Sequence, residues 1–170
     1  MYTRRKPIQG FTLIEILVVI GMIAVLASIV LIAINPLRQF ALARNAQRES
    51  DVNAILNAMG ERLAENKGVF TDSVICTQLL PSGAPIVIGT SGNELDLRKC
   101  LVPAYISEIP MDPATGRNTC VSPGCNTNAQ ESYDTSYTFV QDPATSRITI
   151  CAPGSAESAI PGSQPYCLTR

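Results

Sequence analysis

The fold is decided by residues 10–36, GFTLIEILVVIGMIAVLASIVLIAINP, an apolar run with one acid, Glu15, near its start. Residues 16–34 carry no charge. As a helix that rises about 1.5 Å per residue, they would span about 29 Å, the thickness of the hydrocarbon core of a bilayer. We therefore expect a membrane-spanning helix, in which a lone carboxylate costs about 2.5–3.5 kcal/mol unless something offsets its charge.

Basic residues precede this run. Arg4, Arg5 and Lys6 form a cluster of the kind that remains in the cytoplasm, so the chain after Ile34 is predicted to lie outside. Three arginines beyond the run oppose this orientation: Arg38, Arg44 and Arg48. A secretory signal peptide is the competing interpretation, with ALA at residues 41–43 as the cleavage site. Its apolar region would hold only about 7–15 residues, however, and the run found here is longer and contains an acid.

The composition describes one modest soluble domain joined to the apolar run. Of 170 residues, 46% are hydrophobic and only 5% are aromatic, and the chain has no Trp and no His. The 13 basic and 14 acidic residues give a net charge of -1, and without the three basic residues at the start the net charge is -4. Such a body has no broad attraction for phosphate backbones or anionic lipid.

All six cysteines lie after the apolar run and the charged segment that follows it: Cys76, Cys100, Cys120, Cys125, Cys151 and Cys167. An even number within one small region rich in Gly and Pro indicates disulfides formed in an oxidising compartment. Zinc is the weaker alternative, because the chain has no C-x2-C pair and no His. Free buried cysteines are the third alternative.

The segment after the run is predicted to continue as an amphipathic helix. Its apolar stripe recurs at helical spacing: Val52, Ile55, Leu56, Met59 and Leu63. The polar residues expected on the other faces are Arg48, Asp51, Asn57, Glu61, Arg62 and Glu65. Gly68 is the predicted C-cap. Pro36 has no N–H to donate and disfavours helical geometry at Asn35, so a bend or an unwound turn is expected there.

From Val69 onward, short segments broken by Pro, Gly, Asn and Ser predict small strands and turns. Residues 84–89 read as a strand, and residues 93–106 as a short helix that Asn93 caps and Pro103 stops. Residues 137–140 and 147–151 alternate like the strands of an antiparallel hairpin.

Two near copies, DPATGR at residues 112–117 and DPATSR at residues 142–147, predict similar turns. Asp followed by Pro suits a type I turn in which the Asp side chain accepts backbone N–H bonds. The alternative is a calcium site that uses Asp112 or Asp142, which would need at least about six converging oxygens.

With these features in place, residues 4–36 resemble the N-terminus of a type IV pilin or pseudopilin. A basic leader that ends in Gly10, then Phe11, Glu15 and a long apolar helix, carry the resemblance, which extends over about residues 4–50. It implies an α+β, pilin-like fold, in which a long N-terminal helix packs on a small antiparallel β-sheet with a disulfide-stapled C-terminal region. The expected parts are a leader peptide (1–10), a transmembrane and assembly helix (11–35), an amphipathic helix (36–68) and a β-rich domain (69–170).

The resemblance also implies roles for single residues. A prepilin peptidase would cut between Gly10 and Phe11, and the new amino group of Phe11 would be N-methylated. Glu15 would then meet the N-terminal ammonium of Phe11 on a neighbouring subunit, an attraction of about 4 kcal/mol at about 4 Å and an effective dielectric near 20. The alternatives for Glu15 are snorkelling to water and pairing with its own N-terminus. The stretch expected to unwind in a filament runs from Gly21 to Pro36.

The sequence departs from the family at two points. Pro36 lies four residues beyond the proline of many pilins, and six cysteines suggest three bridges in place of the usual single pair. Fifteen connectivities are possible. We favour near neighbours: Cys76–Cys100, Cys120–Cys125 and Cys151–Cys167.

The leading hypothesis is a pilin that polymerises through its N-terminal helix into an extracellular filament for adhesion, motility or DNA uptake. The implied partners are other copies of the chain, prepilin peptidase, the assembly machinery in the membrane, and membrane lipid before assembly, while nucleic acid is left open. A periplasmic type II secretion pseudopilin is the second hypothesis, because residues 105–116, YISEIPMDPATG, loosely resemble the segment before the calcium loop of major pseudopilins. A single-span anchor with a binding domain is the third. An enzyme is disfavoured, and no cofactor is expected beyond the calcium candidate.

Overall fold

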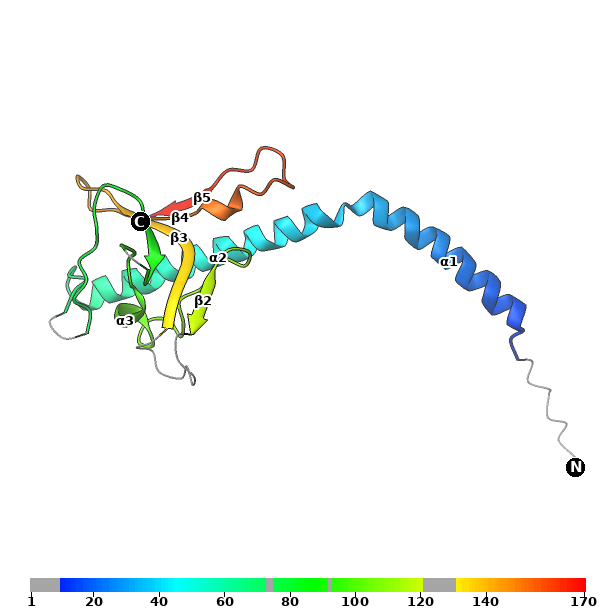
Figure 1. Ribbon diagram of the computed structural model, residues 1–170, viewed down its shortest axis with the longest axis horizontal. Helices are drawn as coiled ribbons and strands as arrows, with labels where there is room; N and C mark the ends of the chain where they lie inside the picture. Colours follow the sequence, from blue (N-terminus) through cyan, green and yellow to red (C-terminus); the bar gives the residue numbers. More distant parts are fainter. Residues whose placement is uncertain (1–9, 73–74, 92, 121–130) are drawn as a thin grey trace, which may run out of the picture. The chain divides into compact units, whose positions relative to one another are not determined.

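A computed structural model describes residues 10–72, 75–91, 93–120 and 131–170. Internal contacts divide the chain into two units, Met1–Gln39 and Phe40–Arg170. The elements follow in this order (Figure 1): α1 (Leu13–Ile34), α2 (Pro36–Glu65), β1 (Ile86–Gly89), α3 (Arg98–Leu101), β2 (Arg117–Cys120), β3 (Glu131–Gln141), β4 (Ile148–Ala152), the 3-10 helix η1 (Pro153–Ser155) and β5 (Tyr166–Thr169).

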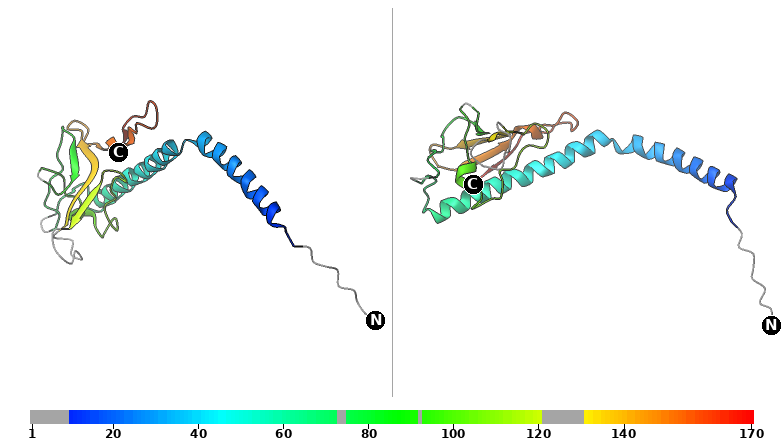
Figure 2. Two further views of the ribbon diagram at one scale, coloured as in Figure 1. Left: turned by 45° about the vertical axis from the view of Figure 1, so that its right-hand side comes forward. Right: turned by 60° about the horizontal axis from the view of Figure 1, so that its bottom comes forward.

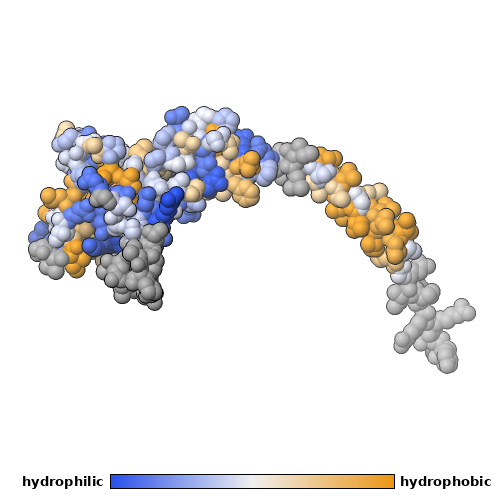
Figure 3. Space-filling model, viewed as in Figure 1, coloured by the Kyte–Doolittle hydropathy of each residue, from blue (hydrophilic) through white to orange (hydrophobic). Residues whose placement is uncertain are grey.

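The helix α1 has no core of its own. Its 22 residues cover about 33 Å, and those from 13 to 30 are exposed on every side. The window Leu13–Val30 has a mean hydropathy of 2.9, and hydrophobic residues make up most of the visible face of the helix (Figure 3). A helix that is apolar all round needs a membrane or other helices around it. The predicted apolar helix is therefore present, and it has the length and composition to cross a bilayer.

Asn35 separates α1 from α2. Its φ of 47° and ψ of 80° are left-handed, a conformation that Asn adopts more readily than most residues. Both its carbonyl oxygen and its side-chain oxygen accept the N–H of Arg38, at 3.1 and 3.4 Å. Pro36 occupies the first position of α2, where its missing N–H costs nothing. The predicted break near Asn35 and Pro36 is confirmed, and it is one residue long.

The helix α2 buries the apolar stripe that its sequence predicts. Val52, Ile55, Leu56 and Met59 are buried, and Leu63 is partly buried against the same core. After Glu65, both Lys67 and Gly68 are left-handed, and the Gly68 N–H donates to the carbonyl of Leu63 at 2.7 Å. Gly68 therefore helps to close the helix as predicted, but Lys67 shares the left-handed turn.

Three polar residues of α2 are not where the stripe placed them. Arg48, Asp51 and Arg62 are buried, with 1%, 4% and 7% of their surface exposed. Asp51 accepts the hydroxyl of Tyr137 at 2.8 Å, and the bonds of Arg48 and Arg62 to other parts of the chain are described below. The apolar stripe assigned these residues to the other faces of the helix and did not predict their burial, because helical periodicity carries no information about distant partners.

The five strands form one antiparallel sheet. Its order is β1-β3-β4-β5, and β2 also pairs with β3. The long strand β3 pairs with β2 along its first four residues and with β1 from Asp134 onward. Asp134 belongs to both pairings, opposite Arg117 of β2 and opposite Gly89 of β1. The predicted hairpin is β3–β4, with Phe139 opposite Ile150.

The sheet and α2 share one core (Figure 2). In β4 the residues alternate between buried and half-buried positions, so Ile148, Ile150 and Ala152 face inward. They meet Tyr137 and Phe139 of β3 and the apolar stripe of α2. Each such side chain contributes about 1.5–3 kcal/mol by leaving water. The α+β fold expected from the sequence is thus observed.

The predicted helix over residues 93–106 is mostly wrong. Only α3, four residues long, is helical, and Asn93 does not cap it. Leu95 instead pairs with β1, because its N–H donates to Val87 at 2.8 Å and its carbonyl accepts from Gly89 at 3.0 Å. Backbone pairing with the sheet thus takes the place of the first helical turns.

Among the described residues of the second unit, two disulfides close loops. Cys76–Cys100 and Cys151–Cys167 are bonded as predicted, and the second pair joins neighbouring strands β4 and β5. The predicted bridge between Cys120 and Cys125 lies outside the described side chains. Loop closure of this kind raises the free energy of unfolding by about 2–4 kcal/mol per bridge.

Candidate functional site

The first turn of α1 holds Glu15 by reciprocal hydrogen bonds with Thr12. The N–H and the hydroxyl of Thr12 donate to Oε2 of Glu15 at 2.8 and 2.7 Å, and the N–H of Glu15 donates to Oγ1 of Thr12 at 3.3 Å. Thr12 is the N-cap, with the extended backbone that this position requires. The arrangement is a capping box, and it places the carboxylate at the positive end of the helix dipole.

Thr12 was not among the predicted partners of Glu15. The signal was present, because Thr followed three residues later by Glu before an apolar run is the signature of a capping box. Within the described part of the chain, Oε1 of Glu15 accepts no hydrogen bond. One oxygen of the carboxylate is therefore committed to Thr12, and the other is open to a further partner.

The predicted cleavage junction lies in exposed, non-helical backbone. Gly10 and Phe11 lie before the helix, and 84% of the Phe11 surface is exposed. A Cβ placed on Gly10 would meet nothing within 4 Å. A cut after Gly10 would leave the capping box intact, because every atom of the box belongs to Thr12 or Glu15.

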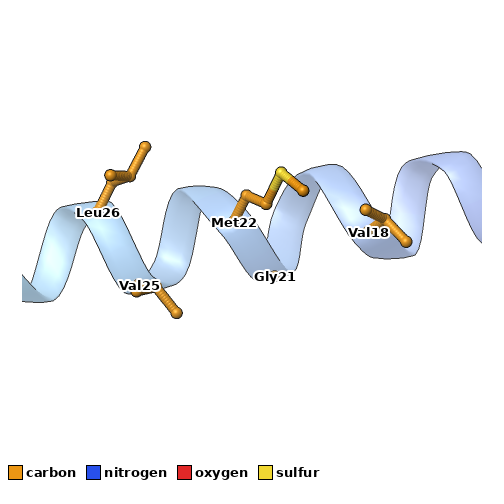
Figure 4. A pocket seen from close by; sticks show the side chains of 5 residues that line it. All are labelled: Val18, Gly21, Met22, Val25 and Leu26. Carbon is orange, nitrogen blue, oxygen red and sulfur yellow. The ribbon is translucent and has the colours of Figure 1, made fainter.

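Gly21 leaves an open apolar notch on α1. Val18, Met22, Val25 and Leu26 surround it, and Figure 4 shows their side chains around the bare stretch of helix. The helix runs through Gly21 without interruption in this structure. Unwinding between Gly21 and Pro36 within a filament remains a prediction.

The two DPAT sequences form the same turn. In each, Oδ1 of the Asp accepts the N–H groups two and three residues on, at 2.8 and 2.9 Å. The carbonyl of each Asp also accepts the N–H four residues on, at 3.0 Å for Asp112 and 2.8 Å for Asp142. The predicted turns are therefore present, with a closing bond one residue longer than that of a type I turn.

The environments of these turns differ. Asp142 is exposed, whereas Asp112 is 3% exposed and receives Nε and Nη2 of Arg48 at 2.6 and 3.1 Å. Burial on its own would raise the pKa of the Asp112 carboxyl, but the bonds from Arg48 and from the turn N–H groups outweigh it and lower the pKa to about 2. Calcium at Asp112 would have to compete with a guanidinium group. Among the described residues, no three acidic or cysteine side chains gather as metal ligands.

Arg48 also joins a second acid. Its Nη1 donates to Glu157 at 2.7 Å, and Arg44 donates to both oxygens of Glu157 at 2.7 and 2.8 Å. The hydrogen bonds of Arg44 and Arg48 lower the pKa of Glu157 to about 2. The cluster thus ties α2 to the turn before β2 and to the loop after η1.

Gly154 makes room for this cluster. A Cβ on Gly154 would lie 2.7 Å from Oδ2 of Asp112 and 3.0 Å from Nη2 of Arg48. Both distances are shorter than ordinary contacts, and both atoms are held by the ion pair. A glycine is therefore required here for space.

A second arginine organises the far end of α2. Arg62 donates to the carbonyls of Phe70 and Cys100 at 2.7 and 2.8 Å and to Asp72 at 2.7 Å. Its guanidinium lies 5.5 Å from the centre of the Phe70 ring. It therefore anchors the chain after α2 beside the Cys76–Cys100 bridge.

Residues 5–31 match the family described as the prokaryotic N-terminal methylation motif. The match covers the end of the predicted leader, the predicted cleavage junction between Gly10 and Phe11, the Thr12–Glu15 capping box and most of α1. The chain therefore carries the class III signal of type IV pilins and pseudopilins. No curated protein and no solved structure matches the chain.

Proposed function

We propose that this chain is the precursor of a type IV pilin, a structural subunit that is cut after Gly10, N-methylated at Phe11 and polymerised through α1. The methylation motif at residues 5–31 carries the proposal. The subunit would wait in the cytoplasmic membrane as a single-pass protein and then enter an extracellular filament that serves adhesion, motility or DNA uptake. Its partners would be prepilin peptidase, the membrane assembly machinery and other copies of itself.

The geometry at Glu15 supports a two-stage role for this residue. Before cleavage Oε2 is held by Thr12 and Phe11 contributes only a peptide N–H. After cleavage each subunit gains an ammonium at Phe11, and Oε1 of Glu15 is open to accept it from a neighbour. Because the attraction of about 4 kcal/mol is comparable with the cost of a charge in the membrane, assembly would favour processed subunits.

Mass spectrometry of the membrane-extracted protein tests the first step. The mature chain should begin at a methylated Phe11. A chain that begins at Met1 or after Ala43 would contradict the proposal, and would favour an uncleaved single-span anchor or a signal peptide. Electron microscopy of sheared surface material, with antibody labelling, should then show long fibres that contain this chain.

A type II secretion pseudopilin is the second candidate. It is favoured only by the short likeness of residues 105–116, and Asp112 in that segment is already bonded to Arg48. A pseudopilin would give short periplasmic assemblies in place of surface fibres. A melting temperature that rises with calcium would support it, and one that is insensitive to calcium would favour the pilin.

A further inference from the structure

The first turn of α2 is exposed along its whole length. Residues 36–40 are all exposed, including Leu37 at 72% and Phe40 at 64%. The buried residues of α2 begin only at Ala41. Two large apolar side chains are therefore exposed directly after the apolar helix. Burial of each would stabilise the protein by about 1.5–3 kcal/mol.

This turn is amphipathic. Leu37 and Phe40 are three residues apart and so lie on one side of the helix, while Arg38 and Gln39 take the opposite side. No acidic residue occurs between Glu15 and Glu49. A short helix with Leu and Phe on one face and Arg on the other is suited to the interface of a membrane.

The length of α1 places this turn at the depth of the lipid headgroups. Its 22 residues cover about 33 Å, which fills a hydrocarbon core of about 30 Å. The residues that follow Asn35 then enter the headgroup layer, which adds roughly 5–7 Å on each side. Leu37 and Phe40 thus come at the boundary between acyl chains and headgroups.

Arg38 is the arginine of this region that remains available. Arg44 and Arg48 are bonded to Glu157 and Asp112, whereas the described structure contains no ion pair for Arg38. A guanidinium group presents paired donors that match the oxygens of a phosphate. Its exposed position suits contact with a lipid headgroup.

We propose that the first turn of α2 is a phospholipid-binding anchor of the membrane-inserted subunit. Leu37 and Phe40 enter the acyl boundary, and Arg38 binds a lipid phosphodiester. The inference rests on the proposed function only in taking α1 as a membrane span. It assigns a ligand to the one turn that lies between this span and the folded domain.

A single tryptophan can test the depth of this turn, since the chain has none of its own. The full-length Phe40→Trp variant is placed in phosphatidylcholine vesicles whose acyl chains carry bromine near the headgroup or near the chain end. Ile23→Trp in α1 serves as the deep control, and Glu61→Trp, at an exposed polar position of α2, serves as the aqueous control. Phe40→Trp should be quenched about twofold more by the shallow bromines than by the deep ones, and Glu61→Trp by neither.

Two results would overturn the lipid assignment. One is a Phe40→Trp emission that is open to aqueous iodide and insensitive to lipid bromine, as for Glu61→Trp. The other is a Phe40→Trp side chain that lipid bromine does not quench and that is shielded from iodide only at a high protein-to-lipid ratio. That result would mean that a second copy of the chain covers the turn.

The phosphate contact has its own test. Arg38→Gln, added to Phe40→Trp, should roughly halve the shallow quenching in phosphatidylcholine, while Arg38→Lys should retain most of it. In vesicles of an uncharged galactolipid without phosphate, Arg38→Gln should have no effect. An Arg38→Gln variant that matches its parent in phosphatidylcholine would overturn the phosphate contact.

These outcomes are independent of filament formation. Processing at Gly10 and fibre growth are measured on Phe40→Trp in cells. Normal fibres together with a water-exposed Trp would contradict the anchor proposal and leave the pilin proposal intact. Membrane-shielded Trp without fibres would do the reverse.

Discussion

Arg48 on α2 and Asp112 before β2 are joined by two hydrogen bonds, at 2.6 and 3.1 Å, although 64 residues separate them in sequence. Both side chains are almost fully buried, with 1% and 0% of the side-chain surface exposed. Water cannot replace either partner. The pair therefore fixes where α2 lies against the sheet domain.

Removing one side of this pair should be costly. Arg48→Met would leave the Asp112 carboxylate buried and short of its cation, which destabilises a fold by about 3–5 kcal/mol. Chemical unfolding of the full-length protein in nonionic detergent measures the effect. Arg147→Met, at an exposed site, is the matched control and should change the free energy of unfolding by less than about 0.5 kcal/mol. Equal losses for the two variants would contradict a stabilising pair.

The same cluster predicts sensitivity to acid. The pKa values of Asp112 and Glu157 are about 2 in the folded chain, below the usual 3.8 and 4.5. Groups with lowered pKa values stabilise the fold above their unfolded pKa and lose this contribution as the pH falls. The melting temperature should therefore fall between about pH 5 and pH 2, with about 2 kcal/mol from Asp112 alone. Asp112→Asn should flatten this dependence, and an unchanged slope in that variant would contradict the assignment.

Glycine substitutions at two sites should have opposite signs. Gly154→Ala would push a Cβ against the Arg48–Asp112 pair and should destabilise the protein by about 1–3 kcal/mol. Gly60→Ala, in the exposed interior of α2 with nothing within 4 Å of the new Cβ, should stabilise it by about 0.5–1 kcal/mol. The comparison uses the same unfolding measurement, and a neutral Gly154→Ala would show that the cluster yields without loss.

Thr12 should order the start of α1. Thr12→Val keeps the shape but removes the hydroxyl of the capping box, at a cost of about 1 kcal/mol. Amide hydrogen exchange at Glu15 and Ile16, whose N–H groups bond to Thr12, should become about fivefold faster in detergent, since about 1.4 kcal/mol corresponds to tenfold. Thr12→Ser restores a hydroxyl and should restore protection. Equal exchange in Thr12→Val and the unmodified chain would show that the box contributes nothing.

Glu15 should matter for assembly and not for insertion. Glu15→Val removes the predicted partner of the Phe11 ammonium, so membrane insertion should persist while incorporation into filaments is lost or slowed. Carbonate extraction reads insertion, and immunoblotting of sheared fibres reads incorporation. Glu15→Asp keeps the charge with a shorter reach and serves as the matched variant. Normal fibres from Glu15→Val would contradict the pairing of subunits through this residue.

Local patterns in the sequence predicted the elements whose causes are local. The charge-free run, the break at Asn35, the stripe of α2 and the β3–β4 hairpin follow from spacing and from turn residues, and the structure has each of them. The bonds Cys76–Cys100 and Cys151–Cys167 follow from proximity along the chain. Thr12 was predictable as well, since its signature lies within four residues of Glu15.

The buried charges were not predictable in the same way. Arg48 finds its acids 64 and 109 residues away, and no local pattern encodes either partner. Residues 93–97 were predicted to be helical because their local pattern does not show the backbone bonds that they make to β1. Both errors have one origin: long-range pairing overrides local preference when the paired groups are buried.

The twin DPAT turns supply an internal calibration for the ion pair. Asp112 and Asp142 cap the same backbone groups at the same distances, but only Asp112 also holds Arg48. Asp142→Asn would therefore report the contribution of the turn by itself. Subtracting its effect from that of Asp112→Asn would leave the part due to Arg48 and burial.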